Sequence, residues 1–413
     1  MFSSSSKLQR WANGKMQKKW KLFHATDFES LMYPSFTYCY MLGMFPYKIN
    51  ALVFEISTPH YILSTIIIGV CVISLLYILY LINFSMKYPD ISIPTKLNCN
   101  SFYILSSFIV VVTYILSGPR MHLLQTIKDI SSKLPSELYQ KLSKLIHAKD
   151  LLGSLFLLLQ MLIYCKINMH FIIKIYIIYI NLLTFHMDML YMNCVCILKA
   201  CFKRINDNLE NMREYTMVYH PDKMCYKQRN PLLLIELRAL KKQHLMISNT
   251  VQMLNIIFSL QLLATVILTF TRITFNLYYQ ILYWQGGIIV INLEDHIYNT
   301  FLIMNIMYYF IKIMLIIWAC ETGKNQALQI GTTVHDMLNN IDDNEIKNEL
   351  QLFSLQLLHR DNTFSAKSLI MDATLLTAIV GSISTYLLIL IQFLKMKYYC
   401  DDEIARNITQ IIH

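Results

Sequence analysis

Seven stretches of mostly apolar residues are spread along the chain, and each predicts a helix that crosses a membrane. A spanning α-helix requires about twenty predominantly apolar residues. Only 10 Gly and 9 Pro occur in the whole chain, so long uninterrupted helices are expected. The third stretch is short and is expected to extend beyond its apolar core. The predicted spans are residues 61–82, 101–118, 151–165, 175–198, 245–271, 297–320 and 373–394.

The direction of these spans follows from the Lys and Arg residues in the segments between them. Segments on one side carry 27 such residues and segments on the other side carry 8. Because positively charged flanks are retained in the cytoplasm, the N-terminus is predicted inside and the C-terminus outside the cell. The Asn-x-Ser/Thr sequences at Asn83 and Asn407 both fall outside in this topology. G-protein-coupled receptors have the opposite orientation.

The composition agrees with an integral membrane protein, because 55% of the residues are hydrophobic and only 15% are charged. A soluble chain carries about 25% charged residues. No cleavable signal peptide is visible. The net charge of +10 lies between the apolar stretches, so membrane topology explains it and a nucleic-acid partner is not expected. Cys99, Cys165 and Cys400 lie near the predicted outer face, and their odd number leaves a disulfide undecided.

Catalytic and cofactor motifs are absent from the sequence. It contains no phosphate-binding loop, no H-E-x-x-H, no G-x-S-x-G and no G-x-G-x-x-G pattern. We therefore expect neither an enzyme nor a cofactor or metal site. A transporter built from inverted repeats would show paired, interrupted helices, and no internal repeat is visible.

One segment outside the predicted spans has the pattern of an amphipathic helix. Ile346, Leu350, Phe353 and Leu357 recur at helical spacing and form one apolar stripe. Asp342 and Asp343 favour a helix start just before it. The stripe predicts packing either on other cytoplasmic helices of the same subunit or on a neighbouring subunit.

Ionisable residues within predicted spans are candidates for function by default. His186, Asp188 and Lys312 are of this kind. Asp188 and Lys312 lie toward the inner ends of their spans, where helices that continue into the cytoplasm would expose them to water. A structural ion pair between them is the alternative.

Residues 385–393, Thr-Tyr-Leu-Leu-Ile-Leu-Ile-Gln-Phe, close the last span. They are a full match to a pattern in the last transmembrane helix of insect gustatory receptors. Leu42-Gly43-Met44-Phe45-Pro46 resembles that family's element before the first span. Phe364, Ala366 and Asp372 keep the spacing of a family pattern ahead of the last span, although Ser368 stands where Gly is usual. Leu387 replaces the Glu that is common in the sugar-receptor branch, so membership in that branch is not implied.

The resemblance implies an all-α, seven-helix, ligand-gated cation channel in the plasma membrane of a chemosensory cell. It also implies a homotetramer, or a heteromer with other gustatory receptors, in which the last helix of each subunit lines the pore. Its known ligands are small-molecule tastants such as sugars and bitter compounds. On this basis Ile389, Gln392 and Phe393 are the candidate pore and gate residues, and Thr385 and Tyr386 belong to the family motif. Odorant receptors, which share the architecture, and a seven-span transporter remain alternatives.

The domain organisation follows from these elements. Residues 1–58 form a cytoplasmic N-terminal region and residues 59–320 a ligand-binding bundle, with a cytoplasmic connection at 201–244. Residues 321–368 form a cytoplasmic anchor region, 369–394 the pore helix and 395–413 an extracellular tail. Polar and aromatic residues at the outer depth of the bundle are candidate ligand contacts, with helix packing as their other role. These candidates are Gln160, Tyr164, Tyr179, Gln261, Thr265, Asn305 and Tyr309, with Trp284 as a lid.

Overall fold

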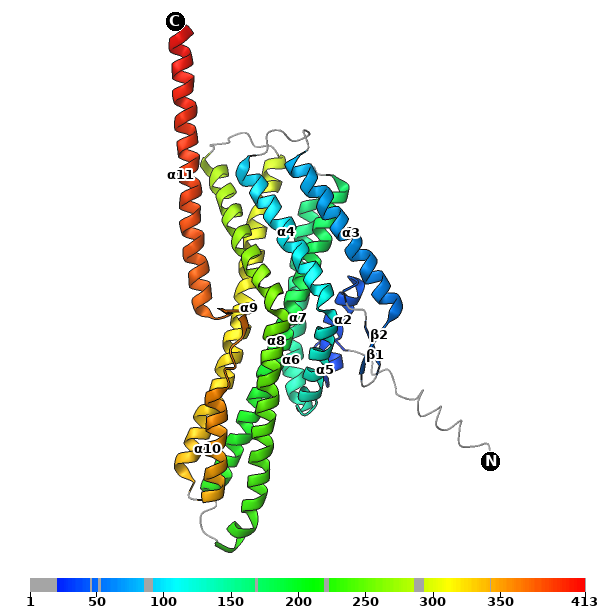
Figure 1. Ribbon diagram of the computed structural model, residues 1–413, viewed down its shortest axis with the longest axis vertical. Coiled ribbons are helices and arrows are strands. Elements are labelled where there is room, and N and C mark those ends of the chain that lie inside the picture. Colours follow the sequence, from blue (N-terminus) through cyan, green and yellow to red (C-terminus); the bar gives the residue numbers. More distant parts are fainter. Residues whose placement is uncertain are drawn as a thin grey trace, which may run out of the picture.

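Long helices that run side by side dominate the structure, a computed structural model (Figure 1). It describes residues 21–44, 47–50, 53–84, 92–167, 170–218, 223–285, 293–341 and 343–412. Seven helices have the length and composition to cross a membrane, as the sequence predicts. The helices are α2 Phe28–Met41, α3 Thr58–Asn83, α4 Ile93–Ile115, α5 Ser117–Ser131, α6 Ser136–Cys165, α7 Phe171–Val218, α8 Lys223–Gln285, α9 Leu293–Asn340, α10 Asn344–His359 and α11 Ala373–Ile412.

Two small antiparallel β-hairpins interrupt this helical architecture, and the sequence did not predict them. β1 (Tyr47–Asn50) pairs with β2 (Val53–Ile56) just before α3. β3 (Ser365–Ala366) pairs with β4 (Leu369–Ile370) just before α11. Both hairpins therefore stand at the entrance to a predicted span.

Helices α7, α8 and α9 extend far beyond the spans predicted for them. The apolar part of α7 continues as a mixed, charged helix to Val218, and α8 already begins at Lys223. The predicted connection at 201–244 is therefore mainly the ends of two helices, and Pro231 lies inside α8. These extensions project from the bundle at the lower end of Figure 1.

Helix α10 packs against the extended ends of α8 and α9. Asp343 caps its first turn, because its carboxylate accepts hydrogen bonds from the backbone N–H groups of Glu345 and Ile346. This confirms the helix start predicted from the sequence. Asp342 lies outside the described residues. Of the predicted stripe, Ile346, Leu350 and Phe353 are buried against the same subunit and Leu357 is partly buried. Glu349 bonds to Arg238 at 2.8 Å and Lys241 at 2.6 Å, and these hydrogen bonds lower its pKa.

A tight turn ends α2 and positions it on the bundle. The N–H of Gly43 bonds to the carbonyl of Tyr40, and the N–H of Met44 to that of Cys39, which is the Schellman pattern. Gly43 adopts φ +71°, a conformation that favours glycine. Its carbonyl accepts from Ser64 of α3. Phe45 and Pro46, the rest of the expected family element, lie outside the described residues.

The second predicted span is shifted in the structure. It begins earlier, at Ile93, and ends at Ile115 rather than at residue 118. Gly118 and Pro119 lie in the first turn of α5, where a proline is tolerated because the first N–H groups of a helix have no intrahelical partner.

Helix α11 stands at the edge of the bundle, where it packs against α8 and α9 (Figure 1). Asp372 caps its first turn, since its carboxylate accepts from the N–H groups of Thr374 and Leu375. The hydroxyl of Thr374 also donates to this carboxylate, at 2.5 Å, and this bond is the main cause of its lowered pKa. Lys324 of α9 lies 3.9 Å away and lowers the pKa further. The start of α11 is thus tied to α9.

Candidate functional site

The two faces of α11 differ in what they contact. Leu375, Ile379 and Ile383 recur every four residues and are buried on the side of the subunit's own bundle. Tyr386 continues this side, with its ring edge-on to Phe270 of α8 at 5.6 Å between ring centroids. No described residue of the same subunit covers the other face of α11.

The candidate gate residues lie on this uncovered part of α11. Ile389 is 39% exposed and Phe393 is 66% exposed, and Gln392 between them is exposed as well. Thr385 is also exposed, and its hydroxyl bonds to the carbonyl of Gly381 in its own helix. Whether these residues line a pore stays a prediction, but a single subunit leaves them free to meet other subunits or water.

The exposed surface of α11 is more polar than the exposed surface of α3, which is almost entirely apolar. Both spans are only 17% buried. The exposed residues of α3 are mainly aliphatic and aromatic, for example Ile66, Val70 and Leu76. Those of α11 include Thr377, Ser382, Ser384, Thr385 and Gln392. Hydrocarbon offers no hydrogen-bond partner to an amide such as Gln392, so this face fits a neighbouring subunit or a water-filled lumen better than lipid.

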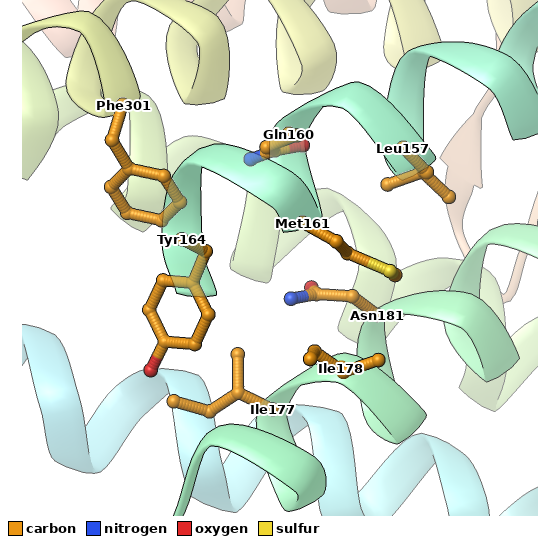
Figure 2. A pocket seen from close by; sticks show the side chains of 8 residues that line it. All are labelled: Leu157, Gln160, Met161, Tyr164, Ile177, Ile178, Asn181 and Phe301. Atoms are coloured by element: carbon orange, nitrogen blue, oxygen red, sulfur yellow. The ribbon is translucent and has the colours of Figure 1, made fainter. Parts of the chain in front are cut away.

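A pocket lies between α6, α7 and α9, and Figure 2 shows the side chains that surround it. Its cavity volume is about 20 Å³, which admits one or two water-sized molecules and is far below the roughly 300 Å³ at which small-molecule sites begin. None of the described residues that line it is charged. Its lining consists of Leu157, Gln160, Met161, Tyr164, Ile177, Ile178, Asn181 and Phe301.

Gln160, which lines this pocket, and its partner Asn305 behind it both have hydrogen-bonding groups to spare. Gln160 donates to the side-chain oxygen of Asn305 at 2.5 Å. The remaining oxygen of Gln160 and the nitrogen of Asn305 are buried without a partner in the part of the chain that the structure describes. Unpaired buried polar groups are costly, so a free acceptor and a free donor here favour a bound molecule or water. Tyr164 packs beside them, 5.3 Å from Phe301 between ring centroids.

The other candidate ligand residues lie elsewhere. Tyr179 donates to the carbonyl of Leu42 in the turn after α2. Tyr309 lies buried beneath Lys312, 5.2 Å from the ammonium to its ring centroid. Trp284 is 70% exposed at the end of α8, and the segment that follows it, 286–292, lies outside the described residues. Of the candidates, the structure brings together Gln160, Tyr164 and Asn305.

Gln261 and Thr265 belong to a buried charged network instead. Both donate to one oxygen of Asp188, at 3.2 and 3.0 Å. The other oxygen of Asp188 lies 3.0 Å from the ammonium of Lys312. The expectation of water around this pair is wrong, because Asp188 is 0% and Lys312 2% exposed. Packing of α7, α8 and α9 against one another closes this region, and the ion pair is the alternative that the structure contains.

Several features near the site went unpredicted. Asn181 and Phe301 line the pocket, and the signal for Asn181 was a lone amide within an apolar span. Arg120 was counted only as a topology signal, yet it is buried and donates to Gln261 at 2.6 Å. His186 is buried and stacks on Tyr38, 4.3 Å between ring centroids.

Cysteines and potential metal ligands suggest no further chemistry. Cys99 and Cys165 are free thiols, and the side chain of Cys400 lies outside the described part of the chain, as does that of Asn407. Asn83 pairs with Asn100 through its side chain. Among the described residues, no group of three His, Cys, Asp or Glu side chains is arranged to hold a metal ion.

Known structures share this architecture. The insect olfactory receptor OR5 from Machilis hrabei superposes with a TM-score of 0.63 over 88% of this chain and 97% of that chain, at 11% identity. The same receptor in complex with eugenol gives a TM-score of 0.64 at 12% identity, over 89% and 98% of the two chains. The chain therefore has the fold of this olfactory receptor.

Sequence comparison defines the family. Residues 32–397 match the profile of the 7tm Chemosensory receptor family, so the chain belongs to this family and is a multi-pass membrane protein. It is 35% identical over 115 residues to the protein named gustatory receptor 28a of Drosophila melanogaster. It is 32% identical over 152 residues to gustatory receptor 28b of that species. These matches cover 28% and 36% of this chain, and 25% and 32% of the relatives.

Proposed function

We propose that this protein is a gustatory receptor that acts as a cation channel opened directly by a small tastant. The uncovered, polar face of α11 is the observation that carries this proposal. Within one subunit, Ile389, Gln392 and Phe393 on this face are exposed, and the described residues do not cover them. Placed around a central axis, four copies would enclose a lumen in which Ile389 and Phe393 form an apolar constriction.

The assembly follows from the same surface. A ring with four α11 helices at its axis and the other six spans of each subunit outside it satisfies both faces of α11. In this proposal the N-terminus lies in the cytoplasm and the C-terminus outside, and the excess of Lys and Arg on one side supports this orientation. The extended ends of α8 and α9, with α10, form the cytoplasmic anchor.

The ligand binds between α6, α7 and α9, in the pocket of Figure 2, which movement of its lining side chains must enlarge to admit it. The uncharged lining favours a neutral molecule. Tyr164 and Phe301 offer ring faces, while the free oxygen of Gln160 and the free nitrogen of Asn305 match a hydroxyl, which both donates and accepts. A small ring compound with one or two hydroxyl groups fits these groups better than a sugar covered with them. Eugenol, bound by the olfactory receptor with the same fold, is such a compound.

Whole-cell recording from cells that express this chain alone tests the proposal. Separate panels of hydroxylated ring compounds, sugars and amino acids would be applied with G-protein signalling blocked. We expect a fast inward current with the first panel. Phe393→Ala should change the current or its leak at rest, since it removes the constriction.

A matched control separates the pore from general damage to the membrane domain. Tyr77→Ala on α3 removes an aromatic ring that is 53% exposed, compared with 66% for Phe393, and it should leave the current unchanged. A ligand current that is unaffected by both Phe393→Ala and Gln392→Ala would disprove the pore assignment. Ligand uptake without current would indicate the transporter alternative, and a response to volatile ligands alone would indicate an odorant receptor.

A further inference from the structure

A second cavity lies where α2 and the turn after it pack against the bundle, away from the ligand pocket. Residues of α2, α4, α5 and α7 enclose it. Its volume admits about one water-sized sphere. The lining residues are Cys39, Met44, Thr113, Ser117, Arg120, Leu124, Met187 and Leu190.

Arg120 is the charged group of this cavity. It is 4% exposed, and one of its terminal nitrogens donates to Gln261 at 2.6 Å. The ring of Phe258 covers the guanidinium, 4.7 Å from its carbon to the ring centroid. The other two nitrogens, Nε and Nη1, have no hydrogen-bond partner within the described residues. The hydroxyl of Thr113, 1% exposed, lacks one as well.

The positive charge of Arg120 lacks a counter-charge of its own. Across the described chain, no carboxylate lies within ion-pair distance of its guanidinium. Asp188 is reached only through Gln261 and is already paired with Lys312. Asp150, the other acid near the cavity, is paired with Lys149. The buried groups around Asp188 therefore carry two positive charges and one negative charge.

Neither titration nor the neighbouring thiol removes this excess charge. Burial lowers the pKa of Arg120 to about 10, which leaves the guanidinium protonated at neutral pH. Burial also raises the pKa of the Cys39 thiol to about 12, so this thiol stays neutral beside it. An isolated buried charge is strongly unfavourable.

We propose that the cavity holds a chloride ion, bound by Arg120 and Thr113. A chloride ion is larger than a water molecule, so the side chains that line the cavity must move slightly outward to hold it. It accepts hydrogen bonds from both free guanidinium nitrogens and from the Thr113 hydroxyl. One water molecule accepts at most two of these hydrogen bonds, and it would leave the charge uncompensated. Because Arg120 lies on α5 and Thr113 on α4, the ion would join these two helices, with Cys39 of α2 in the wall of the cavity.

The test measures the melting temperature of the protein in lipid nanodiscs at constant ionic strength. Chloride or bromide replaces gluconate step by step. Gluconate serves as the reference anion because it is too large for the cavity. Binding to the folded state should raise the melting temperature by roughly 1–2 °C per tenfold increase in halide above its dissociation constant. Arg120→Gln should abolish this dependence. Arg204→Gln, which removes an exposed guanidinium from α7, should retain it.

Thr113→Val provides a second reading if Arg120→Gln fails to fold. Loss of one hydrogen bond should raise the chloride concentration at half-maximal stabilisation about 3- to 10-fold. Equal melting temperatures in chloride and gluconate would overturn the proposal and indicate water in the cavity. A halide dependence that persists in Arg120→Gln would also overturn the proposal. If Arg120→Gln cannot be purified, an unchanged halide dependence in Thr113→Val would overturn it.

Discussion

The carboxylate of Asp188 on α7 and the ammonium of Lys312 on α9 form an ion pair inside the bundle, 3.0 Å from Lys312 Nζ to Asp188 Oδ2. Thr265 and Gln261 of α8 bond to the same carboxylate. One acidic side chain thus joins three of the longest helices. These contacts assign Asp188 and Lys312 a structural role and explain how charged residues persist within apolar spans.

Removing one partner of this pair should be far more harmful than removing both. Asp188→Asn keeps an acceptor for Thr265 but leaves Lys312 as an unpaired buried cation, so we expect a loss of about 3–5 kcal/mol in the free energy of unfolding. Addition of Lys312→Met to Asp188→Asn should recover most of that loss. Thermal unfolding of the single and double variants in nanodiscs measures both effects. Additive losses in the double variant would contradict the ion-pair role.

The turn after α2 should require glycine at position 43. Any other residue must adopt φ near +71°, which costs about 1–2 kcal/mol, so Gly43→Ala should lower the stability by that amount. An added Cβ would also lie 2.4 Å from the Cδ1 atom of Ile67, a side-chain end that can move. Gly69→Ala on α3 is the control, because a Cβ there meets nothing within 4 Å. Equal melting temperatures for the two variants would argue against this account.

The cap at Asp372 should make the start of α11 sensitive to acid. The pKa of this carboxyl is lowered in the folded state by the bond from Thr374 and by Lys324. Its stabilising contribution is therefore present above the unfolded pKa, about 3.9, and is lost as pH falls through the folded pKa. Asp372→Ala should lose about 1 kcal/mol near neutral pH, and this difference from the unmodified protein should shrink on acidification.

Asp372→Asn serves as the comparison for that experiment. Asparagine is an equally good N-cap but does not titrate, so this variant should show a flatter stability profile below the unfolded pKa. Melting temperatures of all three proteins between neutral pH and pH values below about 4 would be compared. Parallel profiles for Asp372→Asn and the unmodified protein would show that the carboxylate charge is irrelevant at this position.

The ligand pocket should respond to loss of its free amide. Gln160→Leu removes both the bond to Asn305 and the spare acceptor, while it keeps a similar volume. For a hydroxylated ligand we expect the concentration of half-maximal current to rise about tenfold, which corresponds to about 1.4 kcal/mol. Leu162→Ala on the same helix, where the side chain is 66% exposed, should have no effect. An unchanged response of Gln160→Leu would place the ligand elsewhere.

Properties that depend only on neighbouring residues could be read from the sequence. The number of spans follows from apolar length, and the cap at Asp343 follows from hydrogen bonds within one helical turn. The apolar stripe that starts at Ile346 is likewise local, since its helical spacing alone places it on one face. The glycine turn after α2 is also a local feature of the backbone, but it was not predicted from the sequence.

Only the tertiary structure decided which residues meet across helices. Gln160 and Gln261 were equivalent in sequence, yet one faces the pocket and the other bonds to Asp188, because helix rotation and crossing angles are set by packing over the whole bundle. The same packing left the cavity at Arg120 without a carboxylate partner. It also covered one face of α11 and exposed the other, so the tertiary structure determined which residues of that helix are available to other subunits.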